Sequence, residues 1–169
     1  MNLNKINLSV GKLASKESTK YRLNGIHFTS NYTEATNGFY FARITYPRQV
    51  TCEELPVMIK TTEKESLKEF IIPLDAIKSI PIVKGKVGLP LLAETYLDVD
   101  YTNDNGIAKF QTTNLETTPT IEVKKLDAKF PDVTQIWPND DKAVFEICVD
   151  ASLLKTVADV ADIGPRITE

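Results

Sequence analysis

The chain has 169 residues, which is enough for one domain, or for one domain and part of another. Hydrophobic residues make up 42% and charged residues 25% of it, and no apolar run approaches the ~20 residues of a membrane-spanning helix, so the composition is that of an ordinary globular protein. The formal net charge of −3 excludes a globally basic protein, so any nucleic-acid contact has to use a local basic face.

The cysteines and the first residues bear on compartment and redox state. Cys52 and Cys148 lie far apart and lack the C-x-x-C spacing of a zinc site or the pattern of a disulfide framework. Residues 1–10 carry no signal-peptide core. We therefore expect a reduced, cytoplasmic protein that does not enter a membrane.

Residues 6–15 form the first periodic segment and predict an amphipathic helix. Its apolar face carries Ile6, Val10, Leu13 and Ala14. At about 100° per residue, three lysines fall within a narrow arc on a different side of the helix: Lys5, Lys12 and Lys16. Three lysines alone are most simply a solvated face, so this basic stripe does not by itself indicate a ligand.

Two strands are predicted next, over residues 21–28 and 39–46, joined by the short polar segment 29–38. Asn37 and Gly38, at the end of that segment, can take the positive φ values of a tight hairpin turn. Three aromatic residues follow in a row: Phe39, Tyr40 and Phe41. Since three consecutive rings cannot all face one core, this stretch is either a turn entering a buried strand or the rim of a binding site.

The second half of the chain repeats this order of elements. Its predicted elements are a strand at 69–73, a helix at 74–80 that Pro81 ends, and strands around 93–101, 107–112 and 120–126, with Asn105 and Gly106 as a hairpin turn. The repetition predicts an α+β fold of two similar halves, each a helix plus an antiparallel sheet, with the helices gathered on one sheet face. After a linker marked by Pro131 and Pro138, a strand at 143–149 and a helix at 151–163 begin a third unit.

Motifs for catalysis, metal binding and nucleotide binding are missing from the sequence. The single histidine, His27, lies in a predicted strand, where a lone histidine is far more often structural than catalytic. Asp98 and Asp100 begin like a calcium loop, but Asn103 and Lys109 stand where that loop needs glycine and glutamate. No glycine-rich phosphate loop occurs either. We therefore expect no enzyme, no catalytic residue, no metal site and no cofactor.

Four segments carry a resemblance to a known family: YRLNGIHF (21–28), EATNGFYFARITYP (34–47), FIIPLDAI (70–77) and KLDAKFPDVTQIWP (125–138). In this order and at roughly this spacing, they resemble the middle domain of the bacterial DNA polymerase III β subunit, the sliding clamp. The resemblance implies the DNA-clamp fold and divides the chain into a clamp-type domain, 1–138, and an incomplete further domain, 139–169. The second of these looks like the opening strand and helix of the clamp's last domain.

By this resemblance the protein is a replication processivity factor that encircles duplex DNA without sequence specificity and tethers DNA polymerase and the clamp loader through their short peptides. The implied DNA-facing residues are Lys5, Lys12, Lys16, Lys20, Tyr21 and Arg22. The implied half-pocket for partner peptides comprises Leu23, Thr36, Gly38, Phe39, Tyr40, Phe41, Pro131, Gln135 and Ile136. Three rings replace the His-Arg-Leu usual in clamps, so the half-pocket would be more aromatic and less charged.

Two features depart from the clamp pattern. The predicted helix at 151–163 has a net acidic polar side, and Leu74 and Asp75 stand where clamps often place basic residues. With one complete domain, a ring would need self-association into a higher oligomer or association with a full-length clamp. The alternatives are a clamp-fold interaction module that binds a partner peptide without encircling DNA, and a structural domain without clamp activity. The sequence leaves open whether the chain is a fragment of a longer clamp or a complete short protein.

Overall fold

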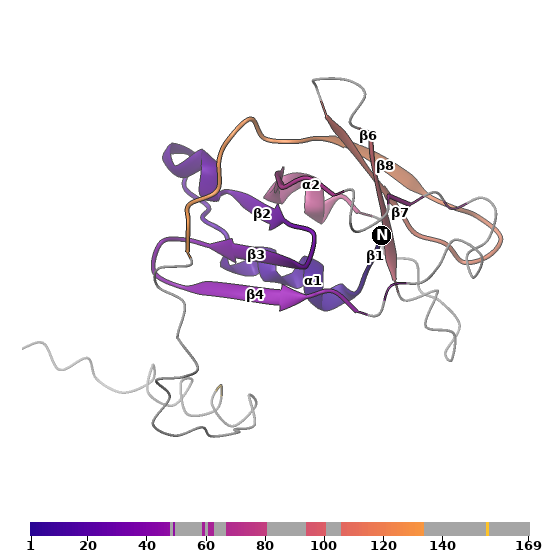
Figure 1. Cartoon of the computed structure of the whole chain (residues 1–169), viewed down its shortest axis with the longest axis horizontal. Helices are drawn as coiled ribbons and strands as arrows, with labels where there is room; N and C mark the ends of the chain where they lie inside the picture. Colours follow the sequence, from indigo (N-terminus) through magenta and orange to yellow (C-terminus); the bar gives the residue numbers. More distant parts are fainter. Residues whose placement is uncertain are drawn as a thin grey trace, which may run out of the picture. The chain divides into compact units, whose positions relative to one another are not determined.

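Two four-stranded antiparallel sheets form the framework of the computed structural model, which describes residues 1–47, 49, 59, 61–62, 67–80, 94–100, 106–133 and 155 (Figure 1). One sheet has the strand order β1-β6-β7-β8 and the other the order β4-β3-β2-β5. The strands are β1 (Asn2–Leu3), β2 (Gly25–Phe28), β3 (Tyr32–Thr36), β4 (Phe41–Thr45), β5 (Phe70–Pro73), β6 (Thr95–Asp100), β7 (Ile107–Gln111) and β8 (Thr120–Lys124). The helices are α1 (Lys5–Ser9) and α2 (Leu74–Lys78), with the 3-10 helices η1 (Val10–Leu13) and η2 (Ser18–Leu23).

The elements come in two runs of the same order, a strand, a helix and then three strands. The first run is β1, α1, β2, β3, β4 and the second is β5, α2, β6, β7, β8. The first strand of each run pairs with the other run's sheet, since β1 lies beside β6 and β5 lies beside β2. The mixture of helices with antiparallel sheets confirms the predicted α+β class.

The chain divides into two compact units, Met1–Pro131 and Asp132–Glu169, and every helix and strand named above belongs to the first. The predicted domain boundary after residue 138 and the predicted strand at 143–149 lie outside the described residues. Of the predicted helix at 151–163, only Lys155 is described, and it is helical and exposed. The division of the chain at residue 138 therefore stays a prediction.

The core contains residues of both sheets and of the helical segments, and three phenylalanines join the sheets within it. Phe28 on β2 stacks on Phe70 of β5, with ring centroids 5.2 Å apart, and meets Phe110 of β7 at 6.0 Å in a tilted arrangement. These rings join strands of both sheets, so burying them couples the two halves of the unit. Around them, Ile26, Ile72 and Leu97 are fully buried and supply the apolar area that stabilises the unit.

The helix predicted over residues 6–15 is a short α-helix followed by a 3-10 turn, and Ile6 does not lie on its buried face. Ile6 is 58% exposed, whereas Asn7 is fully buried. The Asn7 amide donates to the carbonyl oxygens of Ile44 and Thr45, and its own N–H bonds the Asn4 side chain in a capping box. Burial of this amide bridge between α1 and β4 rotates the helix and moves Ile6 into solvent.

The strand predictions for residues 21–46 are partly wrong. Residues 18–23 form η2, so β2 begins only at Gly25, and the polar segment predicted as a connection contains the whole of β3. In β3, Thr33 and Ala35 are fully buried, but Glu34 between them is buried as well. A strand whose two faces are both buried, one of them by charged partners, lacks the apolar and polar alternation that identifies strands in a sequence.

Candidate functional site

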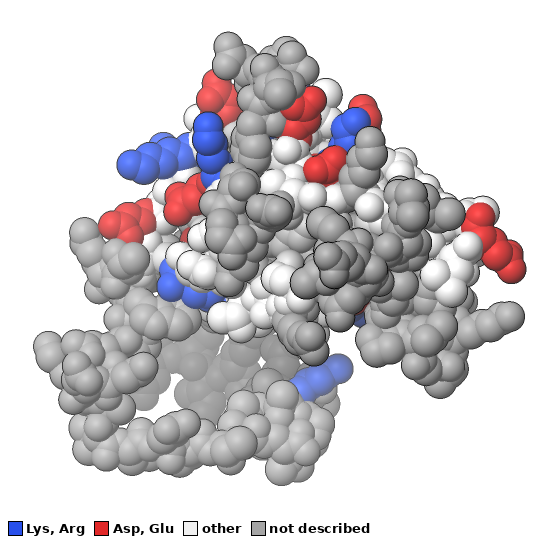
Figure 2. Space-filling view, turned by 45° about the vertical axis from the view of Figure 1, so that its right-hand side comes forward, with Lys and Arg blue, Asp and Glu red and all other residues white. Residues whose placement is uncertain are grey.

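Five of the six predicted DNA-facing residues lie on α1, η1 and η2, and the sixth, Lys16, lies between η1 and η2. Lys5, Lys12 and Lys16 are exposed, but only Lys5 lies in the α-helix, since Lys12 is in η1 and Lys16 follows it, so the three do not lie on one helix as predicted. Tyr21 and Arg22 on η2 are also exposed, and Lys20 is half-buried and pairs with Glu17 at 3.1 Å. Figure 2 shows that Lys and Arg side chains alternate with Asp and Glu over the described part of one face, so that face carries no broad field of one sign.

The predicted half-pocket is built around the connection between β3 and β4. This is a four-residue loop, 37–40, and not the tight two-residue turn predicted from Asn37 and Gly38, because only Gly38 has a positive φ, of 96°. The Asn37 side chain accepts hydrogen bonds from the N–H groups of Phe39 and Tyr40, both at 2.9 Å. The Thr36 hydroxyl donates to the Tyr40 carbonyl oxygen at 2.6 Å and accepts from the Gly38 N–H at 3.0 Å. These bonds hold the loop in one shape.

The loop presents two aromatic rings to solvent. Phe39 is 84% exposed and Tyr40 is 67% exposed, so neither ring is part of the core. The Lys20 ammonium lies 5.8 Å from the centre of the Phe39 ring, within range of a cation–π contact. The structure therefore brings together a residue predicted to face DNA and one predicted to face a peptide, on the adjacent η2 and β3–β4 loop.

Some of the remaining half-pocket residues belong to the described part of the chain, and two do not. Leu23, Phe41 and Pro131 are half-buried, and Thr36 is buried. Gln135 and Ile136 lie outside the described residues, so their place in a pocket stays a prediction.

A buried charged ladder, which the sequence did not suggest, runs across three strands. Glu34 on β3 is only 3% exposed and lies between His27 on β2, whose Nδ1 is 2.8 Å from Oε1, and Arg43 on β4, whose Nε and terminal nitrogen lie 2.9 and 2.8 Å from Oε2. The Arg43 guanidinium also lies 3.9 Å from the centre of the Tyr32 ring. The only sequence signal was opposite charge at positions that pair once β3 is recognised as a strand.

His27 closes one side of this ladder. Its ring stacks on Phe130 with centroids 4.5 Å apart, and its Nε2 lies 3.8 Å from the exposed Glu69 carboxylate. A histidine held by a buried carboxylate has the orientation of a catalytic dyad, but a nucleophile beside Nε2 is needed for that chemistry. Glu69 and Phe130 lie against the His27 ring, and among the described residues no group of three possible metal ligands is found.

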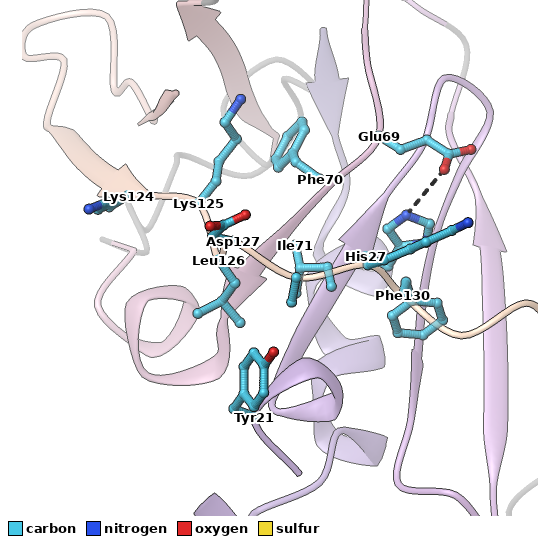
Figure 3. Close-up of a pocket in the computed structure, with 12 residues that line it drawn as sticks. Tyr21, His27, Glu69, Phe70, Ile71, Lys124, Lys125, Leu126, Asp127 and Phe130 are labelled. Carbon is cyan, nitrogen blue, oxygen red and sulfur yellow. Dashed lines mark ion pairs between the residues drawn. The ribbon is translucent and has the colours of Figure 1, made fainter. Parts of the chain in front are cut away.

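A groove of about 800 Å³ lies between η2, β5 and residues 124–130 (Figure 3). After β8, the chain crosses to the other sheet, where the Leu126 N–H donates to the Ile71 carbonyl oxygen at 2.8 Å and forms one wall. In Figure 3, Lys124 and Lys125 lie toward one end of the groove and His27 and Phe130 toward the other. The volume is within the range of ligand-binding pockets.

The groove is lined by both apolar and charged side chains. Its apolar residues are Phe70, Ile71, Leu126, Ala128 and Phe130. Its charged residues are Glu69, Lys124, Lys125, Asp127 and Lys129. Burial and, to a smaller extent, the charge of Lys68 lower the pKa of the Lys125 ammonium, which lies 5.5 Å from the centre of the Phe70 ring.

Comparison of the chain with protein-family models, with curated proteins and with solved structures finds no match. Within the described residues, no helix is long and apolar enough to cross a membrane. Function therefore has to be argued from the chain's own topology and surface.

Proposed function

We propose that the protein is a sliding-clamp-type processivity factor that binds duplex DNA without sequence specificity. The observation that carries the proposal is the doubled strand-helix-three-strand order, in which each first strand pairs with the other half's sheet. A clamp domain, which the sequence resembles, has two similar helix-and-sheet halves. A shared fold alone does not establish function, so the DNA contact needs its own argument.

The DNA contact is supported by the exposed lysines at the start of the chain. Lys5, Lys12 and Lys16 are exposed and come from α1, from η1 and from the residues just after it, on the helical side rather than on the sheets. A sequence-independent contact with duplex DNA uses phosphates only, so a few such lysines from each of several copies would suffice without a globally basic chain.

Closure of a ring requires an interface that repeats head to tail. Among the described elements, β1 and β8 end one sheet and β4 and β5 end the other, so each of these four strands has a single neighbouring strand. Strands at sheet edges present backbone groups that can pair with another copy. Analytical ultracentrifugation at micromolar concentration should therefore detect an oligomer. A strict monomer would exclude a ring formed by this chain alone.

The decisive experiment separates encirclement from simple binding. The protein is incubated with nicked circular duplex DNA, isolated with it by gel filtration, and the DNA is then cut once with a restriction enzyme. A ring should remain on the circle and leave the linear DNA. Equal retention on both forms would contradict the proposal.

The lysines are tested one at a time by the salt dependence of binding. Lys5→Ala, Lys12→Ala and Lys16→Ala should each reduce the slope of log K against log salt by about 0.9, the value for one phosphate contact with duplex DNA. Lys109→Ala is the charge-matched control, because Lys109 lies on β7 and pairs with Glu122 at 3.0 Å. An equal reduction in the control would show that only net charge matters.

A second candidate function, a clamp-fold interaction module, is favoured by the exposed rings of Phe39 and Tyr40. Exposed aromatic side chains are common anchors of protein–protein interfaces. A module of this kind would bind partner peptides of DNA polymerase or of a clamp loader. It would not be retained on circular duplex DNA. Isothermal titration with such a peptide, against Phe39→Ala and Tyr40→Ala, distinguishes the two functions.

A further inference from the structure

The groove beside η2 is not part of the half-pocket that the clamp resemblance implies. Tyr21 of η2 lines the groove, whereas Lys20, its neighbour in η2, contacts Phe39 of the β3–β4 loop. The duplex proposal assigns no role to its lysines, Lys124, Lys125 and Lys129. η2 therefore carries one residue at the groove and one at the loop, and a flexible polymer could contact both.

The rings along this path can offer a face to a planar ligand. Tyr21 is 55% exposed at the groove, and Phe39 and Tyr40 are more exposed still on the neighbouring loop. Bases of single-stranded nucleic acids stack on such rings whatever their sequence, whereas the bases of a duplex already stack on each other. Exposed rings beside lysines are the combination that single-strand binders use.

The charges along the same path favour an anion. Three lysines line the groove against two carboxylates, those of Glu69 and Asp127, and Lys68 lies close enough to Lys125 to act on its ionisation. The Glu69 carboxylate lies 3.8 Å from His27 Nε2. The formal charge of the groove's lysines and carboxylates is therefore positive. The three lysines lie within residues 124–129, so they could contact successive phosphates of one strand.

We propose that this groove, together with the rings of Tyr21 on η2 and Phe39 on the β3–β4 loop, binds a single-stranded nucleic acid, with bases stacked on Tyr21 and Phe39 and phosphates on Lys124 and Lys129. The inference does not depend on ring formation, because a monomer has all of these residues. It differs from the duplex proposal in the form of the nucleic acid and in its reliance on the groove lysines.

The test is a fluorescence anisotropy titration of the full chain with a labelled twelve-nucleotide oligothymidylate. Tyr21→Ala should weaken binding about fivefold or more, the effect of losing one stacked base, while Tyr21→Phe should bind like the wild type because the ring is kept. Leu115→Ala, at an exposed apolar residue on the loop between β7 and β8, is the control for lost surface. Equal binding by Tyr21→Ala and the wild type would overturn the proposal.

The lysines are tested by the salt dependence of the same titration. The double variant Lys124→Ala with Lys129→Ala should reduce the slope by about 1.4, since each phosphate contact with a single strand contributes about 0.7. Lys109→Ala should leave the affinity within about twofold of the wild type, because Lys109 does not line the groove. An unchanged slope in the double variant would contradict the phosphate contacts.

Three competitors identify the ligand. Unlabelled oligothymidylate should displace the probe, and a duplex of equal length should displace it much less. A polyglutamate peptide that competes as well as oligothymidylate would overturn the proposal in favour of an acidic protein partner. Oligouridylate distinguishes the two sources of single strand, since equal competition assigns the groove to both DNA and RNA, and weaker competition assigns it to DNA.

Discussion

At the scale of single residues, Gly25 is the position where side-chain size is most tightly limited. A Cβ atom there would lie 2.3 Å from the Ile72 carbonyl oxygen, and the backbone of β5 cannot move away without parting from β2. Gly25→Ala should therefore lower the free energy of unfolding by about 3 kcal/mol, at the upper end of overpacking effects. Urea denaturation by circular dichroism measures this change.

The matched control is Gly38→Ala. A Cβ at Gly38 meets no atom within 4 Å, but the φ of 96° strains any L side chain. The expected loss is about 1 kcal/mol, from the backbone alone. If the two variants lose equal stability, the contact with Ile72 is not the cause of the Gly25 effect.

Asn7 gives a second prediction at this scale. Its amide nitrogen donates to the carbonyl oxygens of Ile44 and Thr45, at 3.2 and 3.1 Å, in a fully buried position. Asn7→Asp keeps the shape but turns a carboxylate toward two carbonyl oxygens, so we expect a loss of about 3 kcal/mol or more at neutral pH. Thermal unfolding of both proteins across pH measures it.

The pH dependence of this variant has a definite sign. The carboxyl group that Asn7→Asp introduces is buried and faces acceptors, so its pKa is higher in the folded state than in the unfolded state. The variant is therefore destabilised where the unfolded carboxyl is ionised, above pH ~4. Its deficit relative to the wild type should shrink as the pH falls toward that value, since a protonated carboxyl can donate one bond. A deficit that stays constant with pH would contradict the role of Asn7 as a donor.

At the scale of elements, β6 contains a buried phenol whose pKa is raised in the folded protein. Tyr96 is fully buried, and burial, with a smaller effect of the Glu94 carboxylate, raises the pKa of its phenol far above the ordinary value. A phenol in the unfolded chain ionises near pH ~10, so the stabilising contribution of the neutral buried group is complete below that pH and is lost as the pH rises. The loss should be about 1.4 kcal/mol per pH unit above ~10.

Tyr96→Phe isolates this contribution. Other groups titrate at alkaline pH in both proteins, so the informative quantity is the difference between their unfolding free energies from pH ~9 to ~11. That difference should move in favour of the phenylalanine variant as the pH rises. Parallel curves for the two proteins would show that Tyr96 does not carry the alkaline sensitivity.

The sequence predicted some elements of the fold and missed others, for identifiable physical reasons. β5, α2 and β7 were predicted close to their observed bounds, because Pro81 after the helix and the turn at Asn105 and Gly106 before β7 are local signals. β3 was missed because Glu34 is buried by His27 and Arg43, which come from other strands. Burial of a charge by distant partners leaves no local pattern.

The candidate sites divide in the same way. The exposure of Phe39 and Tyr40 agrees with one of the two interpretations that the sequence allowed, because three consecutive aromatic side chains cannot all face one core. The groove could not be anticipated, because it arises only when residues after β8 cross to pair Leu126 with Ile71. Contacts between residues so far apart depend on topology rather than on local composition.

At the scale of the whole molecule, β1 and β5 each pair with the sheet of the other half. This exchange of first strands should make Met1–Pro131 unfold as a single cooperative unit. Each sheet contains a strand from the other half, so neither sheet can lose its exchanged strand without exposing core side chains of both. Phe28, Phe70 and Phe110 extend this coupling through the core. Independent halves would instead open at separate free energies.

Ile72→Ala tests this coupling. Ile72 on β5 is fully buried beside Ile26, and its truncation should cost about 2–5 kcal/mol, as for other large-to-small core changes. Native-state hydrogen exchange should then show the same loss of protection in β6 and β7, which belong to the other sheet, as in β2 and β3. If the amides of β6 and β7 keep wild-type protection, the two halves unfold separately, and the exchanged strands tie the sheets together without coupling their stability.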